Sequence, residues 1–222
     1  MLRYDMAKTP DKKPPNFWHV GDQFLHDLPE IADAIKALVK KYPEFKTAMQ
    51  KIGKLPWKKQ TEGFEGLVNI IIGQQVSVAA AAHIVARLRP LMDEFTPENF
   101  LQLTEDKLRE IGFSRQKVSY SRDIAKRMIS GEFDPERLRD MDTDEALDEL
   151  TSLKGIGIWS AEIYLMFCLG KPDVWPADDI GLQNGLQRFN GYKQRPDAER
   201  TREVGEKWAP YRSAAALIIW KA

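Results

Sequence analysis

The chain has 222 residues, of which 43% are hydrophobic and 30% charged, and its 33 basic and 33 acidic side chains cancel to a formal net charge of zero, so any nucleic-acid site must be local. The length and composition are typical of a globular protein with one large domain or two small ones, and no run of eighteen apolar residues could span a membrane. Because Cys168 is the only cysteine, the sequence excludes an internal disulfide, a cysteine-rich zinc site and a four-cysteine iron–sulfur cluster.

The N-terminal part of the chain predicts a tail followed by a helix. Residues 1–20 are basic and lack an apolar signal core, so we expect a flexible basic arm ahead of a domain over residues 21–222. Apolar residues then recur at helical spacing from Ile31 to Val39, which predicts an amphipathic helix that ends at Pro43.

The rest of the chain also reads as helices with short connections. Residues 64–91 predict two helices separated at Gly73-Gln74-Gln75, with Ser77 as the N-cap of the second. An amphipathic, basic helix ends at Gly131, and residues 198–222 predict two helices split near Pro210. The remaining helix starts are marked by Thr96-Pro97, Thr104, Asp134-Pro135-Glu136 and Asp142, the last with capping-box spacing to Glu145. About ten helices without strands predict an all-α fold, and two lobes with a cleft between them would be natural at this length.

Residues 146–170 read ALDELTSLKGIGIWSAEIYLMFCLG and predict a helix, a tight turn and a second helix from about Ile158. Gly155 and Gly157 allow a sharp turn, and the free N–H groups of the second helix favour an anion beside Lys154. No strand precedes this turn and no Gly-Lys-Ser/Thr follows, which disfavours a nucleotide-binding loop. A helix-hairpin-helix that holds a DNA phosphate fits the pattern, and on this segment alone a plain helical hairpin fits equally well.

The helix after the turn is apolar nearly all round, which predicts a buried central helix. Trp159 in its first turn is either a core residue or an aromatic wall of a cleft. About twenty residues beyond it, Asp178 and Asp179 follow Pro176, which is typical of a helix start with Asp178 as N-cap and Asp179 as a first-turn acid.

This combination resembles the helix-hairpin-helix DNA glycosylase superfamily, in particular the 3-methyladenine DNA glycosylase II (AlkA-like) family. The resemblance covers the chain from about Leu55 to its end, and the segments that carry it are, in family order, IIIGQQVSVAAAAHIVARL, IGFSRQKVSYSRDIA, LKGIGIWSA, DVWPADDIGLQNGLQRF and WAPYRSAAALIIW. It implies an all-α bilobal fold with an active-site cleft between the lobes. The few residues before the matching region imply a compact form without the N-terminal β-containing domain of larger members.

The resemblance also implies roles for individual residues. Asp179 matches the catalytic aspartate, which stabilises the positive charge that builds on the sugar as the N-glycosidic bond breaks. Trp159 matches a wall of the base pocket, on which an electron-poor alkylated purine stacks. Ile163 stands where some relatives carry tyrosine, so one aromatic face is lost. Gln74 and Gln75 lie in the region that fills the gap left by a flipped base, although without the resemblance Gln75 would be read as an exposed loop residue.

Three other aromatic residues could replace the face lost at Ile163, although each is better explained as a core residue: Trp57, Tyr164 and Trp175.

The expected DNA contacts centre on the glycine turn. The hairpin positions that match the family's DNA-binding residues are Lys154, Gly155, Ile156, Gly157 and Ser160. Basic residues that could add phosphate contacts, or simply form a charged helix face, are Arg115, Lys117 and Arg122. No catalytic metal or iron–sulfur cluster is expected. A structural Na⁺ or K⁺ could bind the backbone carbonyls of Thr151, Leu153 and Ile156, as in many family members.

The predicted activity is that of a monofunctional DNA glycosylase of base excision repair. Strand-cutting members of the superfamily carry a lysine where this chain has Trp159, and tryptophan cannot form a Schiff base with the sugar. The expected partner is double-stranded DNA with alkylated bases, bound by a monomer in the cytoplasm and nucleoid of a bacterium or archaeon, or in a eukaryotic nucleus. Two alternatives stay open: a non-catalytic helix-hairpin-helix protein that recognises damaged or abasic DNA, and a helical protein-interaction domain.

Overall fold

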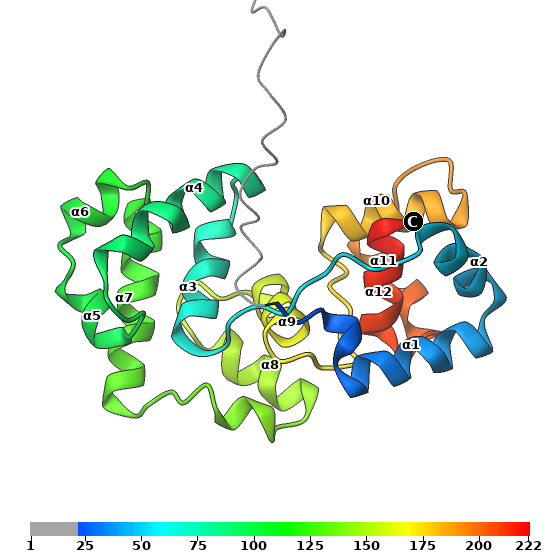
Figure 1. Ribbon diagram of the computed structural model, residues 1–222, viewed down its shortest axis with the longest axis horizontal. Coiled ribbons are helices and arrows are strands. Elements are labelled where there is room, and N and C mark those ends of the chain that lie inside the picture. Colours follow the sequence, from blue (N-terminus) through cyan, green and yellow to red (C-terminus); the bar gives the residue numbers. More distant parts are fainter. Residues whose placement is uncertain (1–21) are drawn as a thin grey trace, which may run out of the picture.

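The computed structural model describes residues 22–222, and the regular elements in this part of the chain are all helices, which confirms the predicted all-α fold (Figure 1). The α-helices are α1 (Pro29–Lys41), α2 (Pro43–Ile52), α3 (Gly63–Gly73), α4 (Val78–Leu88), α5 (Pro97–Gln102), α6 (Glu105–Glu110), α7 (Arg115–Ser130), α8 (Thr143–Thr151), α9 (Ile158–Phe167), α10 (Ile180–Asn190), α11 (Ala198–Glu206) and α12 (Arg212–Lys221). Single 3-10 turns lie at Leu25–Asp27, Arg89–Leu91 and Arg137–Arg139. The basic arm expected over residues 1–20 lies outside the described residues, among which no helix is long and apolar enough to cross a membrane.

Most helix ends follow the capping residues that the sequence marks. The side chains of Ser77, Thr96 and Thr104 each accept a hydrogen bond from the backbone N–H three residues on, which satisfies one of the free donors of the first turn. Asp142 and Glu145 form the predicted capping box at the start of α8. These local signals therefore place four of the helices correctly.

The predicted end of the first helix at Pro43 is confirmed, but the helix that begins there was not predicted, and two other predicted helix starts are wrong. Pro43 ends α1 but also begins α2, because proline is well suited to the first position of a helix, where no N–H bond is lost. Asp134-Pro135-Glu136 starts only the 3-10 turn at Arg137–Arg139, since Asp134 accepts the N–H of Glu136 two residues on and closes a turn instead. Asp179, and not Asp178, is the N-cap of α10.

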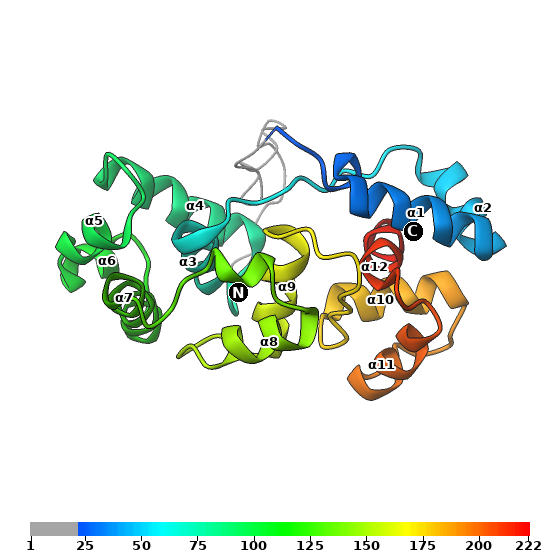
Figure 2. The ribbon, with the colours of Figure 1, turned by 90° about the horizontal axis from the view of Figure 1, so that it is seen from below.

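The helices gather in two groups with α8 and α9 between them (Figures 1 and 2). One group contains α3 to α7, in which α7 packs on α3, α5 and α6. The other joins both ends of the described chain, because α1 packs on α12 and α12 packs on α10. The central helix α9 packs on α3 and α8 and is buried from Ser160 to Met166, as its apolar sequence predicts. This two-lobed arrangement agrees with the expected architecture.

Candidate active site

Asp179 lies at the start of α10 with its carboxylate held by three donors. Oδ1 accepts hydrogen bonds from the backbone N–H of Leu182 (2.7 Å) and from the indole Nε1 of Trp220 (2.9 Å), and Oδ2 accepts one from Nε1 of Trp159 (3.0 Å). Gly181 leaves room for this arrangement, since a Cβ atom there would approach Oδ1 to 2.9 Å. The carboxylate is half-buried and fixed in orientation, as a group that stabilises developing charge must be.

Trp220 is a residue of this site that the sequence did not single out. It lies on α12 at the end of an apolar run, and its ring packs against Trp57 (5.8 Å between centroids) and Phe167 (5.7 Å). Its position in the terminal segment of the resemblance was the only available signal. Together with Trp159, it places an indole ring next to each oxygen of the Asp179 carboxylate.

Two of the aromatic candidates, Tyr164 and Trp175, do not replace a face at Ile163, which is itself buried. Tyr164 is fully buried, and its hydroxyl accepts the backbone N–H of Gly63 at 2.8 Å. Trp175 is also buried, and its Nε1 donates to the backbone oxygen of Thr201 at 2.8 Å. Both side chains are committed to the core.

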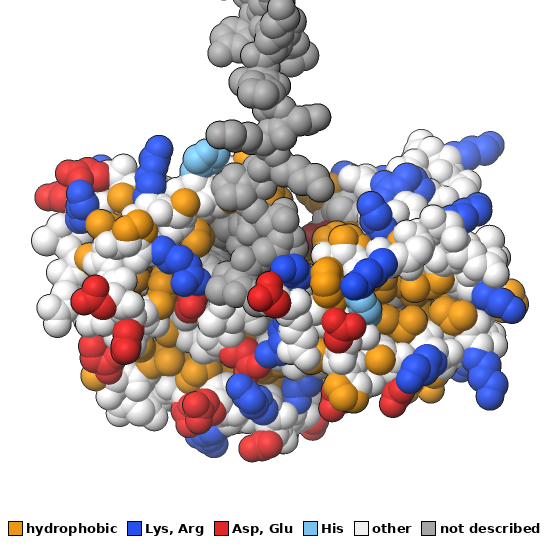
Figure 3. Space-filling view, viewed as in Figure 1, with side chains coloured by type: hydrophobic (Ala, Val, Ile, Leu, Met, Phe, Trp, Pro, Cys, Tyr) orange, Lys and Arg blue, Asp and Glu red, His pale blue; other side chains and the backbone are white. Residues whose placement is uncertain are grey.

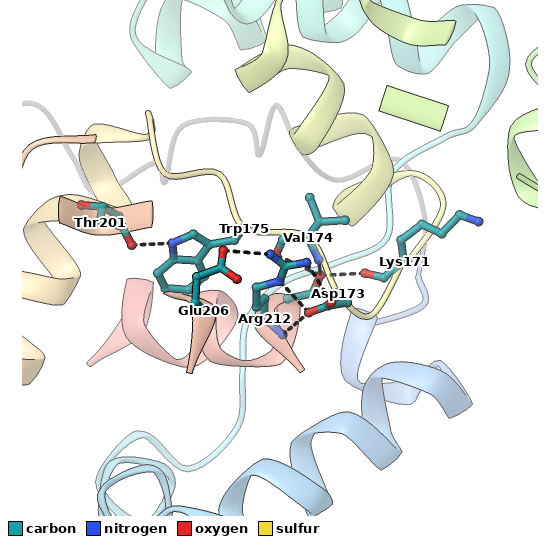
Figure 4. Close-up of polar contacts among 8 residues, drawn as sticks. Lys171, Asp173, Val174, Trp175, Thr201, Glu206 and Arg212 are labelled. Atoms are coloured by element: carbon teal, nitrogen blue, oxygen red, sulfur yellow. Dashed lines mark hydrogen bonds and ion pairs between the residues drawn. The ribbon is translucent and has the colours of Figure 1, made fainter. Parts of the chain in front are cut away.

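The segment between α9 and α10 is fastened at several points before it reaches Asp179 (Figure 4). Asp173 forms a fork with Arg212, with Nε to Oδ1 at 2.8 Å and Nη2 to Oδ2 at 2.9 Å. The hydroxyl of Ser213 accepts the N–H of Val174 at 2.9 Å, and Trp175 is bonded to α11 as described above. We call residues 171–179 the strap; its contacts fix the backbone that presents the carboxylate.

The two hairpin glycines have different environments. Gly155 has φ +86°, and a Cβ atom there would collide with the ring of Tyr120 on α7, so the fold itself requires glycine. Gly157 is the N-cap of α9 with φ −94°, and a Cβ atom there would meet nothing within 4 Å. No side chain caps α9, which leaves its first N–H groups available to an anion.

The two glutamines of the α3–α4 loop point in different directions. Nε2 of Gln74 donates to the backbone oxygen of Gly155 (2.8 Å) and to Oγ of buried Ser160 (3.0 Å), so this side chain ties the loop to the hairpin. Gln75 is exposed and has φ +56°, a left-handed conformation that is uncommon outside glycine and places its side chain at the tip of the loop. Lys154 contacts Oγ of Ser119 at 3.3 Å.

A pocket of about 410 Å³ lies between the α3–α4 loop, the start of α7 and the hairpin. The start of α9 faces it with Gly157, and the start of α7 faces it with Ser114 and Gln116, so two positive helix ends meet there. Nζ of Lys117 donates to the backbone oxygen of Ile72 at 2.7 Å, and burial lowers the pKa of this lysine. The two helix starts, and not Lys117, therefore make the pocket suitable for an anion.

Arg122 does not reach this pocket, because its guanidinium donates to the backbone oxygen of Leu103 at 3.0 Å. Over residues 22–222, no three His, Cys, Asp or Glu side chains gather as metal ligands. Carbonyl oxygens suit a hard cation, and the monovalent cation at Thr151, Leu153 and Ile156 stays a prediction.

Comparison with known proteins places this geometry among DNA repair enzymes. A model of the family described as "HhH-GPD superfamily base excision DNA repair protein" matches residues 68–210. The chain is 32% identical over 167 residues to DNA-3-methyladenine glycosylase 1 of Schizosaccharomyces pombe, covering 73% of each protein. It is 29% identical to DNA-3-methyladenine glycosylase 2 of Escherichia coli, over 72% of this chain and 57% of the relative.

Solved structures give the same picture. The S. pombe 3-methyladenine DNA glycosylase in complex with abasic DNA superimposes with a TM-score of 0.78 at 30% identity, over 85% of this chain and 95% of that chain. A DNA-3-methyladenine glycosidase from Bacillus halodurans gives 0.75 at 32% identity, over 89% and 90%.

Proposed function

Because the chain belongs to the HhH-GPD superfamily of base excision DNA repair proteins, we propose that it is a DNA-3-methyladenine glycosylase that flips alkylated purines out of double-stranded DNA and hydrolyses their N-glycosidic bond. The observation that carries the proposal is the half-buried carboxylate of Asp179, which two indoles hold. One of them, Trp159, lies two residues beyond the uncapped hairpin glycine Gly157. Its place of action is wherever the genome lies, in a nucleoid or a nucleus.

The hairpin holds the DNA backbone. The free N–H groups at the start of α9 bind a phosphate through main chain, which gives affinity without sequence preference. Because Gly157 has no Cβ and open space beside it, a phosphate oxygen can approach the backbone closely. Lys154 adds one exposed positive charge next to this position.

The loop tip fills the gap left by the flipped base. Gln75 stands exposed at the tip, and two branched residues beside it, Val76 and Val78, are 39% and 52% exposed. Such a wedge compensates part of the few kcal/mol lost on unstacking. Gln74 supports the tip from behind through its bonds to the hairpin.

Asp179 then stabilises the cation that forms on the sugar. As the bond to the base breaks, its electron pair leaves with the base, and water adds to the sugar carbon and releases a proton to the carboxylate or solvent. The rings of Trp159 and Trp220 give an alkylated, positively charged purine aromatic surface to stack on. Trp159 offers no amine to the sugar, so the product is an abasic site in an uncut strand.

Asp179→Asn tests the assignment. We expect the release of alkylated bases from DNA, identified by mass, to fall at least about a hundredfold, because the charge that stabilises the sugar cation is gone. Affinity for an abasic-site duplex stays within about threefold of wild type, since the phosphate contacts are untouched. With the wild-type protein, borohydride should trap no covalent complex with damaged DNA, because Trp159 cannot form a Schiff base with the sugar.

Asp197→Asn is the matched control, because Asp197 caps α11 as Asp179 caps α10 but lies away from the two indoles. It should release bases at the wild-type rate. Release at that rate by Asp179→Asn would contradict the catalytic role of Asp179. A wild type that binds abasic DNA but releases no alkylated base would indicate the non-catalytic DNA-binding protein. Failure of the wild type to bind DNA at all would indicate a protein-interaction domain.

A further inference from the structure

Glu162 is a buried acid that the proposed reaction does not use. It lies on α9 three residues after Trp159, so the two side chains leave the same face of the helix about one turn apart. Only 5% of its side chain is exposed. A buried carboxyl group needs a partner for its charge or must stay protonated.

The partner of Glu162 is shared with the residue next to Asp179. Nη1 of Arg202 on α11 lies 3.9 Å from Oε1 of Glu162, and its Nη2 lies 3.1 Å from Oδ2 of Asp178. The second oxygen of Glu162, Oε2, has no hydrogen-bond partner among the described residues. Arg202 therefore sits between a carboxyl group on the central helix and one in the strap, and it is closer to the strap.

We propose, on the basis of the proposed function, that Glu162 is a positioning residue for Asp179: uncharged, it leaves Arg202 to Asp178, and charged, it draws Arg202 away from the turn that presents the catalytic carboxylate. The two distances agree with the uncharged state, because a buried charged carboxylate would hold the guanidinium closer than 3.9 Å.

The groups around Glu162 favour its uncharged form at neutral pH. Burial raises the pKa of Glu162 to about 8; Arg202 lowers it, Asp178 raises it, Arg212 lowers it and Asp179 raises it in turn. These groups face it from α11, the strap and the start of α12.

Arg212 cannot take the place of Arg202, because it is engaged in its fork with Asp173. Above pH 8 the charged Glu162 can therefore form an ion pair only with Arg202. Asp178 then loses its partner, and the turn that presents the carboxylate of Asp179 is no longer held by Arg202. We expect the chemical step to slow on the alkaline side.

The test compares the pH profiles of wild type and Glu162→Gln, a neutral variant of the same shape. Single-turnover excision from alkylated DNA is measured from pH 6 to pH 9.5, after subtraction of spontaneous base loss. In the wild type the rate should fall about tenfold between pH 7 and pH 9, the loss expected of one group with a pKa near 8. In Glu162→Gln the rate should match wild type within about twofold at pH 7 and stay flat to pH 9.

Two further variants sharpen the test. Glu203→Gln on α11 removes an exposed acid that pairs with Arg200, and it should keep the wild-type profile. Arg202→Gln alters a half-exposed side chain and should fold; it should be slow already at pH 7, with abasic-DNA affinity unchanged. The kinetic split between rate and affinity distinguishes positioning from loss of binding.

The inference is overturned if Glu162→Gln keeps the wild-type alkaline fall, or if Arg202→Gln excises bases at the wild-type rate. Either result with an active wild type leaves the proposed function intact. A wild type that releases no alkylated base at any pH overturns the proposed function itself.

Discussion

Asp179 accepts hydrogen bonds from two tryptophans that are 61 residues apart in the chain, one from the first turn of α9 and one from the last turn of α12. A hydrogen bond to a charged group contributes about 1.5–3 kcal/mol to stability, and a buried donor or acceptor left without a partner costs a similar amount. The two indoles therefore help to fix the orientation of the carboxylate. Losing Trp159 would leave Oδ2 without its donor, whereas losing Trp220 would leave Oδ1 with the backbone N–H of Leu182 alone.

Trp220→Phe keeps an aromatic ring but removes the donor to Oδ1 of Asp179. We expect the single-turnover excision rate to fall about tenfold, which corresponds to about 1.4 kcal/mol, with abasic-DNA affinity within about twofold of wild type. Trp208→Phe is the control, since Trp208 is buried and its Nε1 has no hydrogen-bond partner among the described residues. Equal rates for Trp220→Phe and wild type would contradict the role given to the indole.

The two glycines of the α8–α9 hairpin belong to one sequence motif but are needed for different reasons. Gly155 serves the fold, since only glycine tolerates its backbone angle and the nearby ring of Tyr120. Gly157 has an ordinary backbone angle and free space, so nothing in the described fold requires glycine there. We therefore expect the need for glycine at this position to come from the proposed phosphate contact.

Alanine substitutions at the two positions should therefore act on different measurements. Gly155→Ala should lower the free energy of unfolding by at least about 2 kcal/mol, through a strained backbone and the collision with Tyr120. Gly157→Ala should leave that free energy within about 0.5 kcal/mol and lower affinity for an abasic duplex about tenfold. Urea unfolding and fluorescence anisotropy measure the two quantities. If Gly157→Ala binds the abasic duplex with wild-type affinity, the proposed phosphate contact at Gly157 is contradicted.

How far the sequence predicts these elements depends on how local each signal is. Ser77 and Asp142 cap helices through bonds to residues three positions away, so pattern alone locates those helices. The choice between Asp178 and Asp179 as N-cap is not local, because either carboxylate could accept the first-turn N–H. Trp159 and Trp220 accompany one of them and not the other, and Trp220 reaches it only through the packing of α12 on α10.

Across the whole molecule, acidic and basic side chains are mixed over the left and lower parts of the visible face, whereas Lys and Arg predominate over the right-hand group (Figure 3). Because the net charge is zero, any attraction of DNA must come from a local group of basic side chains and not from the charge of the whole chain. We expect much of the affinity for DNA to come from main-chain N–H groups at the start of α9. These groups are uncharged, so their contacts with phosphates add little to the salt dependence of binding. The overall charge balance was readable from sequence, whereas the packing of α1 against α12 across the chain was not.

The affinity for an abasic duplex should therefore depend weakly on salt, with a slope of log K against log salt of about −0.9 per cationic phosphate contact. Lys154→Ala should make this slope shallower by about 1, because it removes one such contact beside the hairpin. Lys36→Ala should leave it unchanged, since Lys36 lies on α1 paired with Asp33. A slope that is the same in Lys154→Ala and wild type would exclude Lys154 from the interface.

The start of α9 also fixes the distance between the proposed phosphate site and the catalytic carboxylate. Gly157 lies at the helix end proposed to bind a phosphate, and Trp159, two residues on, donates a hydrogen bond to the carboxylate proposed to act on the sugar. The spacing between the two residues is set by covalent bonds within one helical turn, and not by how the lobes sit. Under the proposed function, we expect the protein to span a short, constant length along one strand and to reach the same sugar beside any base sequence.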